Sequence, residues 1–166
     1  MGLKLENTYI FIDAARCTGC HLCEIACSMV HHGTCSPRHA RIRIQEFNNP
    51  DQTIPILCQA CDDAPCIKVC PVNARIRKSN QAVVSDEDRC IGCRACLYIC
   101  HQGSPRINPS TGQAMTCDLC EHEESGPWCV AACRDEGALQ FVDCEEYTRK
   151  HAVKQALKLA LGSQRR

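Results

Sequence analysis

Short stretches that alternate between apolar and polar residues recur along the chain. The first occupies 41–44 and 54–57, on either side of a turn at 48–51 that contains two Asn and one Pro. Similar pairs lie at 76–84 and 106–115, again with turn-forming residues in the middle. Alternation with period two around such a turn is typical of antiparallel hairpins. The pattern therefore predicts three short β-hairpins.

The last part of the chain has the period of a helix instead. Apolar residues recur at positions 153, 156, 157, 160 and 161, and lysines at 150, 154 and 158 line another face. Asp143 and Glu146 have the spacing of a capping box, and Gly162 can end the helix. We predict that 143–166 forms an amphipathic helix and tail. This helix either packs on its own domain or docks on a partner subunit.

Cysteine is the unusual component, at 18 of 166 residues against 4% aromatic residues. An ordinary domain of this size buries a core of large apolar residues, so this cysteine content indicates disulfides, zinc or iron–sulfur clusters. Lysine plus arginine equals aspartate plus glutamate, at 19 each, so we expect no nucleic-acid partner. Because no secretory signal or membrane-spanning run is visible, we expect a cytoplasmic protein without membrane insertion, whose thiols stay reduced.

Sixteen cysteines form four groups of four. The first and third groups have the spacing C-x2-C-x2-C-x3-C, the second has C-x2-C-x4-C-x3-C, and the middle gap of the fourth widens to eight residues. In chain order the groups are Cys17, Cys20, Cys23 and Cys27; Cys58, Cys61, Cys66 and Cys70; Cys90, Cys93, Cys96 and Cys100; and Cys117, Cys120, Cys129 and Cys133. All sixteen are candidate cluster ligands. The remaining Cys35 and Cys144 are predicted to be small buried residues.

This spacing has a chemical reason. Three thiolates on one tight loop reach three irons of a single cubane, while the fourth lies further along an emerging helix and ligates a neighbouring cluster. Zinc needs only two C-x2-C pairs and has no use for a further cysteine at this offset. Gly19 and Gly92 follow the first cysteine of their groups, where the backbone has to wrap around the bound group; plain turn glycines are the alternative. The spacing therefore predicts four [4Fe–4S] clusters.

The first and third groups align without gaps, 73 residues apart, which indicates an internal repeat. We predict an α+β fold of two ferredoxin-like two-cluster modules with short hairpins and helices, followed by the C-terminal helix. The tetra-cluster domain is predicted to cover 1–142. Within it, 58–105 forms an inner module, and 9–57 together with 106–142 forms the outer one.

Four cysteine groups with these spacings, over residues 9–142, resemble the four-cluster iron–sulfur subunits of the dimethyl sulfoxide reductase, formate dehydrogenase and hydrogenase complexes. The short length is most similar to that of the small iron–sulfur subunit of bacterial tungsten-dependent aldehyde oxidoreductases. The resemblance implies an electron-transfer function. It also implies a large catalytic partner that holds tungstopterin or molybdopterin, and a flavin-containing subunit. A proline commonly follows the fourth cysteine in this family, and here only Cys70 has one.

The resemblance further implies which groups share ligands. In the outer module, Cys17, Cys20 and Cys23 would bind a cluster with Cys133, and Cys117, Cys120 and Cys129 would bind one with Cys27. In the inner module, Cys58, Cys61 and Cys66 would bind a cluster with Cys100, and Cys90, Cys93 and Cys96 would bind one with Cys70. The residues alone leave another pairing open, in which neighbouring groups share ligands in chain order.

No acid–base pair, activated nucleophile or open metal site is visible outside the cysteine groups, so we predict no substrate chemistry in this chain. Since a linear series of clusters has two ends that need partners, the predicted function is electron transfer between a catalytic oxidoreductase subunit and a second redox protein. A free-standing polyferredoxin and a zinc-binding interaction module are the alternatives. Self-association that extends the wire between molecules is a further hypothesis.

Four histidines lie near the first and third groups. An N–H of His21 or His101 could donate to a cluster sulfur, although simple exposure to solvent is the preferred interpretation. His31 and His32 have no metal-binding spacing with a third ligand and are predicted to lie on the surface.

Overall fold

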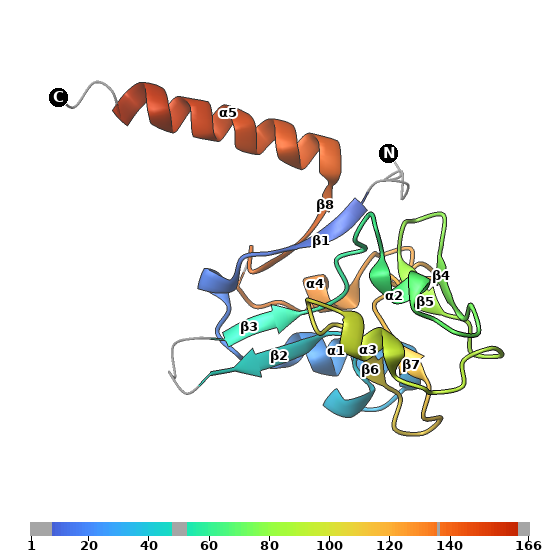
Figure 1. The fold of residues 1–166 in the computed structure, drawn as a ribbon. Coiled ribbons are helices and arrows are strands. Elements are labelled where there is room, and N and C mark those ends of the chain that lie inside the picture. Colours follow the sequence, from blue (N-terminus) through green and yellow to red (C-terminus); the bar gives the residue numbers. More distant parts are fainter. Residues whose placement is uncertain (1–7, 48–52, 136, 163–166) are drawn as a thin grey trace.

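The computed structural model describes residues 8–47, 53–135 and 137–162. The body contains four two-stranded antiparallel sheets and four short helices, and a long C-terminal helix projects away from it (Figure 1). The helices are α1 (Leu22–His32), α2 (Pro65–Lys68), α3 (Ala95–Ile99), α4 (Trp128–Ala131) and α5 (Cys144–Gly162). No helix of the described part is long and apolar enough to cross a membrane. The α+β class predicted from the sequence is confirmed.

All three predicted hairpins are present. They are β2 (Arg43–Glu46) with β3 (Thr53–Ile56), β4 (Arg75–Arg77) with β5 (Val83–Ser85), and β6 (Arg106–Ile107) with β7 (Ala114–Met115). The turn predicted at 48–51 lies outside the described residues. The strand expected at 41–44 begins two residues later, because the N–H of Arg41 donates a hydrogen bond of 3.2 Å to Cys27 Sγ rather than to a neighbouring strand.

A fourth sheet joins segments from opposite ends of the chain and was not predicted. In it β1 (Thr8–Ile12) pairs antiparallel with β8 (Leu139–Asp143), with Ile10 opposite Phe141. Ile10 and Leu139 both point into the core, at 1% and 4% exposure. This pairing closes the cluster-bearing part of the chain, since it places the segment before the first cysteine group beside the segment after the fourth (Figure 1).

The core is thin and partly made of cysteine. Its largest fully buried apolar side chains are Ile10, Ile42, Leu57 and Val83, and most of the remaining buried apolar positions are alanine, valine or cysteine. The same core cluster includes several candidate ligands, which are Cys23, Cys27 and Cys129. Apolar packing and the cysteine groups therefore occupy the same interior.

The start of the C-terminal helix is as predicted. Asp143 Oδ1 accepts hydrogen bonds from the backbone N–H groups of Glu145 and Glu146, at 2.9 and 3.0 Å, and so caps α5. Near this end Tyr147 packs on Phe11 of β1, with the ring centroids 4.6 Å apart. Val153, one turn and a half further along, is 64% exposed. The apolar and lysine positions beyond it lie outside the described side chains, so both packing alternatives for this helix stay predictions.

Candidate iron–sulfur cluster sites

The four cysteine groups begin with the same loop conformation. In each group the residue just before the second cysteine has a positive φ, namely Gly19 (69°), Ala60 (47°), Gly92 (68°) and Leu119 (62°). This left-handed conformation turns the chain sharply and directs successive N–H groups toward a common centre. Because alanine and leucine also adopt it at two of the sites, the conformation belongs to the cysteine loop and not to the glycines alone.

A short helix follows each loop, and the third and fourth cysteines of each group lie within it or just beyond its C-terminal end. In α1, Cys23 and Cys27 lie four residues apart, one helical turn, on the same side. The other three helices keep the same spacing: Cys66 lies in α2 before Cys70, Cys96 lies in α3 before its C-cap Cys100, and Cys129 lies in α4 before Cys133. The third and fourth cysteines of every group are therefore held four residues apart along a helix or its end.

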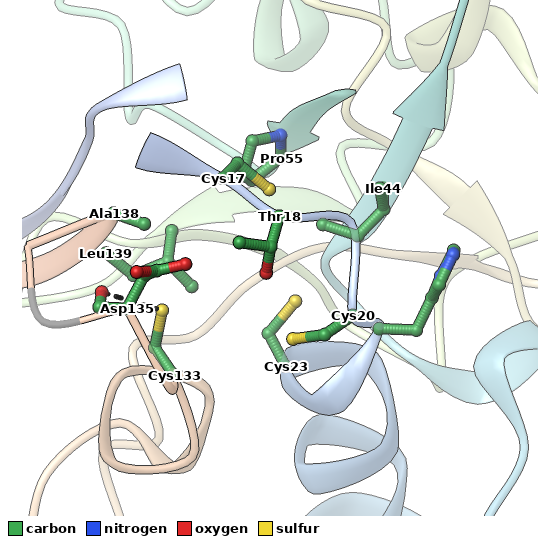
Figure 2. A pocket seen from close by; sticks show the side chains of 11 residues that line it. Cys17, Thr18, Cys20, Cys23, Ile44, Pro55, Cys133, Asp135, Ala138 and Leu139 are labelled. Carbon is green, nitrogen blue, oxygen red and sulfur yellow. Dashed lines mark hydrogen bonds between the residues drawn. The ribbon is translucent and has the colours of Figure 1, made fainter. Parts of the chain in front are cut away.

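The first site lies between the loop before α1 and the end of α4. Cys17, Cys20, Cys23 and Cys133 line one cavity, and Thr18, Ile44 and Leu139 are among the other residues of its wall. Figure 2 shows the four sulfur atoms around the same space. Helices α1 and α4 pack against each other, which brings Cys133 to a loop more than one hundred residues away in the chain.

Two further cavities repeat this arrangement around α2 and α3, which also pack together. One is lined by Cys58, Cys61, Cys66 and Cys100. The other is lined by Cys70, Cys90, Cys93 and Cys96. Each cavity again combines three cysteines of one group with the fourth cysteine of another.

The fourth set consists of Cys27, Cys117, Cys120 and Cys129, which is the most buried of the four. Burial raises the pKa of the Cys117 and Cys129 thiols well above the usual value, and the nearby thiols of Cys27 and Cys120 raise both further. Burial also raises the pKa of Cys120 to about 11. Cys27 and Cys129 lie in the same buried core cluster, and Cys117 packs against it.

These sites fit a cluster cofactor. None of the described cysteines forms a disulfide, and burial raises the pKa of Cys23 to about 12, so a bare thiolate is unfavourable there. Iron supplies the positive charge that would stabilise buried thiolates. Backbone N–H groups already point at several sulfurs: Arg41 N to Cys27, Ala74 N to Cys70, Ala114 N to Cys90 and Leu119 N to Cys117, at 3.2 to 3.5 Å. Such N–H donors are typical of protein-bound clusters.

Both histidines that were predicted to lie on the surface, His31 and His32, are partly buried. His31 was predicted to lie on the surface, but it is largely buried, with Nε2 3.9 Å from Cys120 Sγ and 3.4 Å from Asp118 Oδ1. The reason is that α1 packs on α4 and turns His31 inward. His101 is exposed, and its Nε2 lies 3.9 Å from Cys61 Sγ. His21 instead bridges Glu24 and Glu46, at 2.6 and 2.9 Å.

The two spare cysteines also differ from each other. Cys35 was predicted to be buried but is exposed, because it follows the end of α1 at Gly33. Its Sγ lies 3.5 Å from Met29 Sδ. Cys144 is half-buried at the start of α5. Neither lines any of the three cavities described above.

A buried arginine at the sites was not predicted from the sequence. Arg75 is 3% exposed and lies in the wall of both the Cys58 cavity and the Cys90 cavity. The sequence does carry a signal for it. Ala-Arg-Ile-Arg occurs twice, at 40–43 and at 74–77, each time after the fourth cysteine of a group. The alternation of arginine with isoleucine was used only to predict a hairpin. The alanine that begins each tetrapeptide is fully buried.

Fold and sites together define a small α+β iron–sulfur protein with ferredoxin-like cysteine loops. The family model of the 4Fe-4S dicluster domain matches residues 51–144. The chain belongs to this family and binds [4Fe–4S] clusters.

Relatives extend the match over most of the chain. It is 39% identical to the YsaA protein of Escherichia coli (strain K12), over 90% of this chain and 98% of that protein. It is 39% identical to the "Aliphatic sulfonate oxidoreductase, polyferredoxin-like subunit" of Pyrococcus furiosus, over 82% of this chain and 79% of that subunit. It is also 34% identical to "Electron transport protein HydN" of E. coli, over 76% of this chain and 83% of that protein.

Proposed function

We propose that this protein is an electron-transfer subunit that conducts single electrons through four [4Fe–4S] clusters, between a catalytic oxidoreductase subunit and a second redox partner. The observation that carries the proposal is the gathering of twelve thiols around three cavities, each with three cysteines of one group and the fourth cysteine of another. We assign the remaining four, Cys27, Cys117, Cys120 and Cys129, to a fourth set. We assign one cluster to each set. When bound, a [4Fe–4S] cluster exchanges one electron at a time.

The helices suggest which sites are neighbours. Since α1 and α4 each carry ligands of the Cys17 and Cys117 sites, these two sites form one proposed pair, the outer module of 9–57 and 106–142. Helices α2 and α3 likewise connect the Cys58 and Cys90 sites within the inner module of 58–105. Packing of α1 on α4, and of α2 on α3, supports this division.

Two of the sites come close to the surface. Cys20 of the Cys17 site and Cys93 of the Cys90 site are exposed, and they lie in different proposed modules. Large exposed apolar side chains, Ile91 and Tyr98, flank Cys93 in the sequence. We propose that these two sites are the ends at which partner proteins exchange electrons, because a partner can approach an exposed ligand most closely there.

The proposed catalytic partner is a large oxidoreductase subunit with a tungsten or molybdenum pterin, and the second partner is a flavin-containing subunit. Support for an oxidoreductase partner comes from the name of the P. furiosus relative, and the pterin and the flavin rest on the family resemblance of the cysteine pattern. The chain itself is proposed to have no substrate site, and to work in the cytoplasm.

Anoxic isolation from the native cell tests this proposal. We expect a larger catalytic chain that holds tungsten or molybdenum to co-purify, and four [4Fe–4S] clusters per copy of this chain. A protein that purifies alone and reacts with several redox proteins by collision would favour a free-standing polyferredoxin. Zinc without acid-labile sulfide would refute the electron-transfer function altogether.

A further inference from the structure

Arg75 is a buried cation without an anionic side-chain partner among the described residues. Its Nη1 donates to Ser85 Oγ at 2.8 Å and to Thr116 Oγ1 at 3.0 Å, and its Nη2 donates to Val83 O at 3.2 Å. Its Nε is buried and has no hydrogen-bond acceptor within the described part of the chain. All these partners are neutral. A guanidinium is always charged, and an uncompensated buried charge is costly, so another negative group must balance it.

The proposed clusters are the negative groups within reach. Nη2 lies 3.9 Å from Cys66 Sγ, a ligand of the Cys58 site. Arg75 also lines the Cys90 cavity, where the N–H of the preceding residue, Ala74, donates a hydrogen bond of 3.2 Å to Cys70 Sγ. One guanidinium therefore forms part of the wall between two adjacent sites.

The equivalent arginine of the other module is neutralised. Arg41 occupies the same place in the repeated tetrapeptide, and its Nη1 forms an ion pair of 2.5 Å with Asp118 Oδ2. Asp118 follows Cys117 directly, and Arg41 N donates to Cys27 Sγ, so this pair lies beside the Cys117 site. The two modules thus have an arginine at the same place of the repeated tetrapeptide with different charge partners. Arg41 is partly buried and forms a neutral ion pair near one pair of sites, whereas Arg75 is fully buried and lies as an unpaired cation between the other two.

We infer that Arg75 is a positioning residue that tunes reduction potential: its unpaired guanidinium raises the potentials of the clusters at the Cys58 and Cys90 sites above those that these sites would otherwise have. This inference rests on the cluster function proposed above. One-electron reduction adds one negative charge to a cluster with its four thiolates, and a buried cation beside it stabilises that reduced form. The Arg41–Asp118 pair, which is neutral overall, gives the outer sites no such stabilisation.

Redox titration of the anoxic holoprotein, followed by electron paramagnetic resonance, tests the inference. In Arg75→Gln, we expect the potentials of two of the four clusters to become more negative and those of the other two to stay unchanged. At a fixed applied potential, the ratio of reduced to oxidised cluster should fall at least tenfold. This corresponds to a reduction potential that is more negative by about 59 mV for a one-electron couple. Arg75→Lys keeps the charge, so the potentials of these two clusters should stay close to those of the wild-type protein.

Two control variants separate the buried charge from charge in general. Arg89 directly precedes Cys90, is exposed, and forms an ion pair with Asp86. Arg89→Gln should leave all four potentials unchanged. Asp118→Asn frees the Arg41 charge and should raise the potential at the Cys117 site. The inference is wrong if Arg75→Gln leaves the potentials unchanged, or if it shifts all four equally.

Loss of clusters in Arg75→Gln is informative as well, and iron and acid-labile sulfide measure it. If Arg75→Gln loses two clusters and Arg75→Lys keeps them, the two sites need a positive charge at this position, which agrees with the inference. If both variants lose them, the guanidinium acts through its hydrogen bonds to Ser85 and Thr116 and the inference fails. Wild-type protein without four clusters would instead refute the proposed function.

Discussion

A Cβ atom on Gly92 would lie 2.6 Å from the backbone carbonyl oxygen of Gly112. Gly92 turns the third cysteine loop at a φ of 68°, and Gly112 lies in the turn between β6 and β7. The hairpin at 106–115 is thus pressed against a cluster loop of the other proposed module. Space at Gly92 is limited by backbone, which cannot move aside as a flexible side chain would.

Substitution of Gly92 by alanine should therefore destabilise the fold by about 1–3 kcal/mol from the positive φ, with the contact to Gly112 adding to this cost. Gly33→Ala is the matched control, since Gly33 has a φ of 63° and no atom within 4 Å of its Cβ position. Denaturation midpoints of the two anoxic holoproteins measure the difference. Equal loss in both variants would show that the Gly112 contact costs nothing.

Local patterns and long-range packing were not equally predictable from the sequence. Hairpins such as Ile76 with Val84 form within about ten residues, so alternation and turn residues were sufficient to predict them. Pairing of Ile10 with Phe141 joins segments more than one hundred residues apart, and no local pattern specifies such a partner. The same holds for His31, whose burial depends on the packing of α1 on α4.

The cysteines were predictable because cluster chemistry fixes their spacing, whereas Arg75 was not. A ligand has to lie at a set offset from the next one, and that offset is visible in the chain. A buried arginine between two sites depends on Ser85 and Thr116, which approach it from β5 and from the segment after β7. An arginine in an alternating strand suggests a solvated face unless those partners are known.

Ile10 is expected to be the most costly position to truncate in the apolar core, because it packs at the β1–β8 sheet at 1% exposure. Ile10→Ala should lower the free energy of unfolding by about 2–5 kcal/mol, through lost burial and the cavity left behind. Ile54→Ala, in β3 at 40% exposure, should cost less than half as much. Denaturant unfolding of the holoproteins under anoxia compares them, and similar losses would contradict a core centred on β1.

Removal of the clusters should unfold the body of the protein. Its apolar core is thin, and four free thiols would remain at each site with no cation to hold them together. Burial raises the pKa of several of them, among them Cys23 and Cys117, so at neutral pH the empty sites would hold neutral thiols that form no ionic contacts.

We therefore expect iron chelation under denaturant, followed by removal of the denaturant, to leave a chain that does not regain protected amides. Hydrogen exchange of the β4–β5 hairpin measures this, because the hairpin lies within the inner module beside two proposed sites. Native-like protection there without iron and sulfide would show that the apolar core alone is sufficient to fold the chain.

The assignment of shared ligands is tested by double substitution of cysteines. In the proposed sets, Cys70 and Cys93 bind the same cluster, so the double variant Cys70→Ala with Cys93→Ala should lose no more than either single variant, about four irons per chain. If neighbouring groups shared ligands in chain order, Cys70 and Cys93 would belong to different clusters. The double variant would then lose about eight irons.

A second double variant calibrates this count. Cys58→Ala with Cys70→Ala removes ligands from two clusters under either pairing, so it should lose about eight irons, with sulfide in proportion. Cys144→Ser should keep the full content, because Cys144 lies outside the three described cavities, at the start of α5. Equal iron loss in the Cys70/Cys93 and Cys58/Cys70 variants would favour the chain-order pairing, and a twofold difference favours the sets whose sulfurs line common cavities.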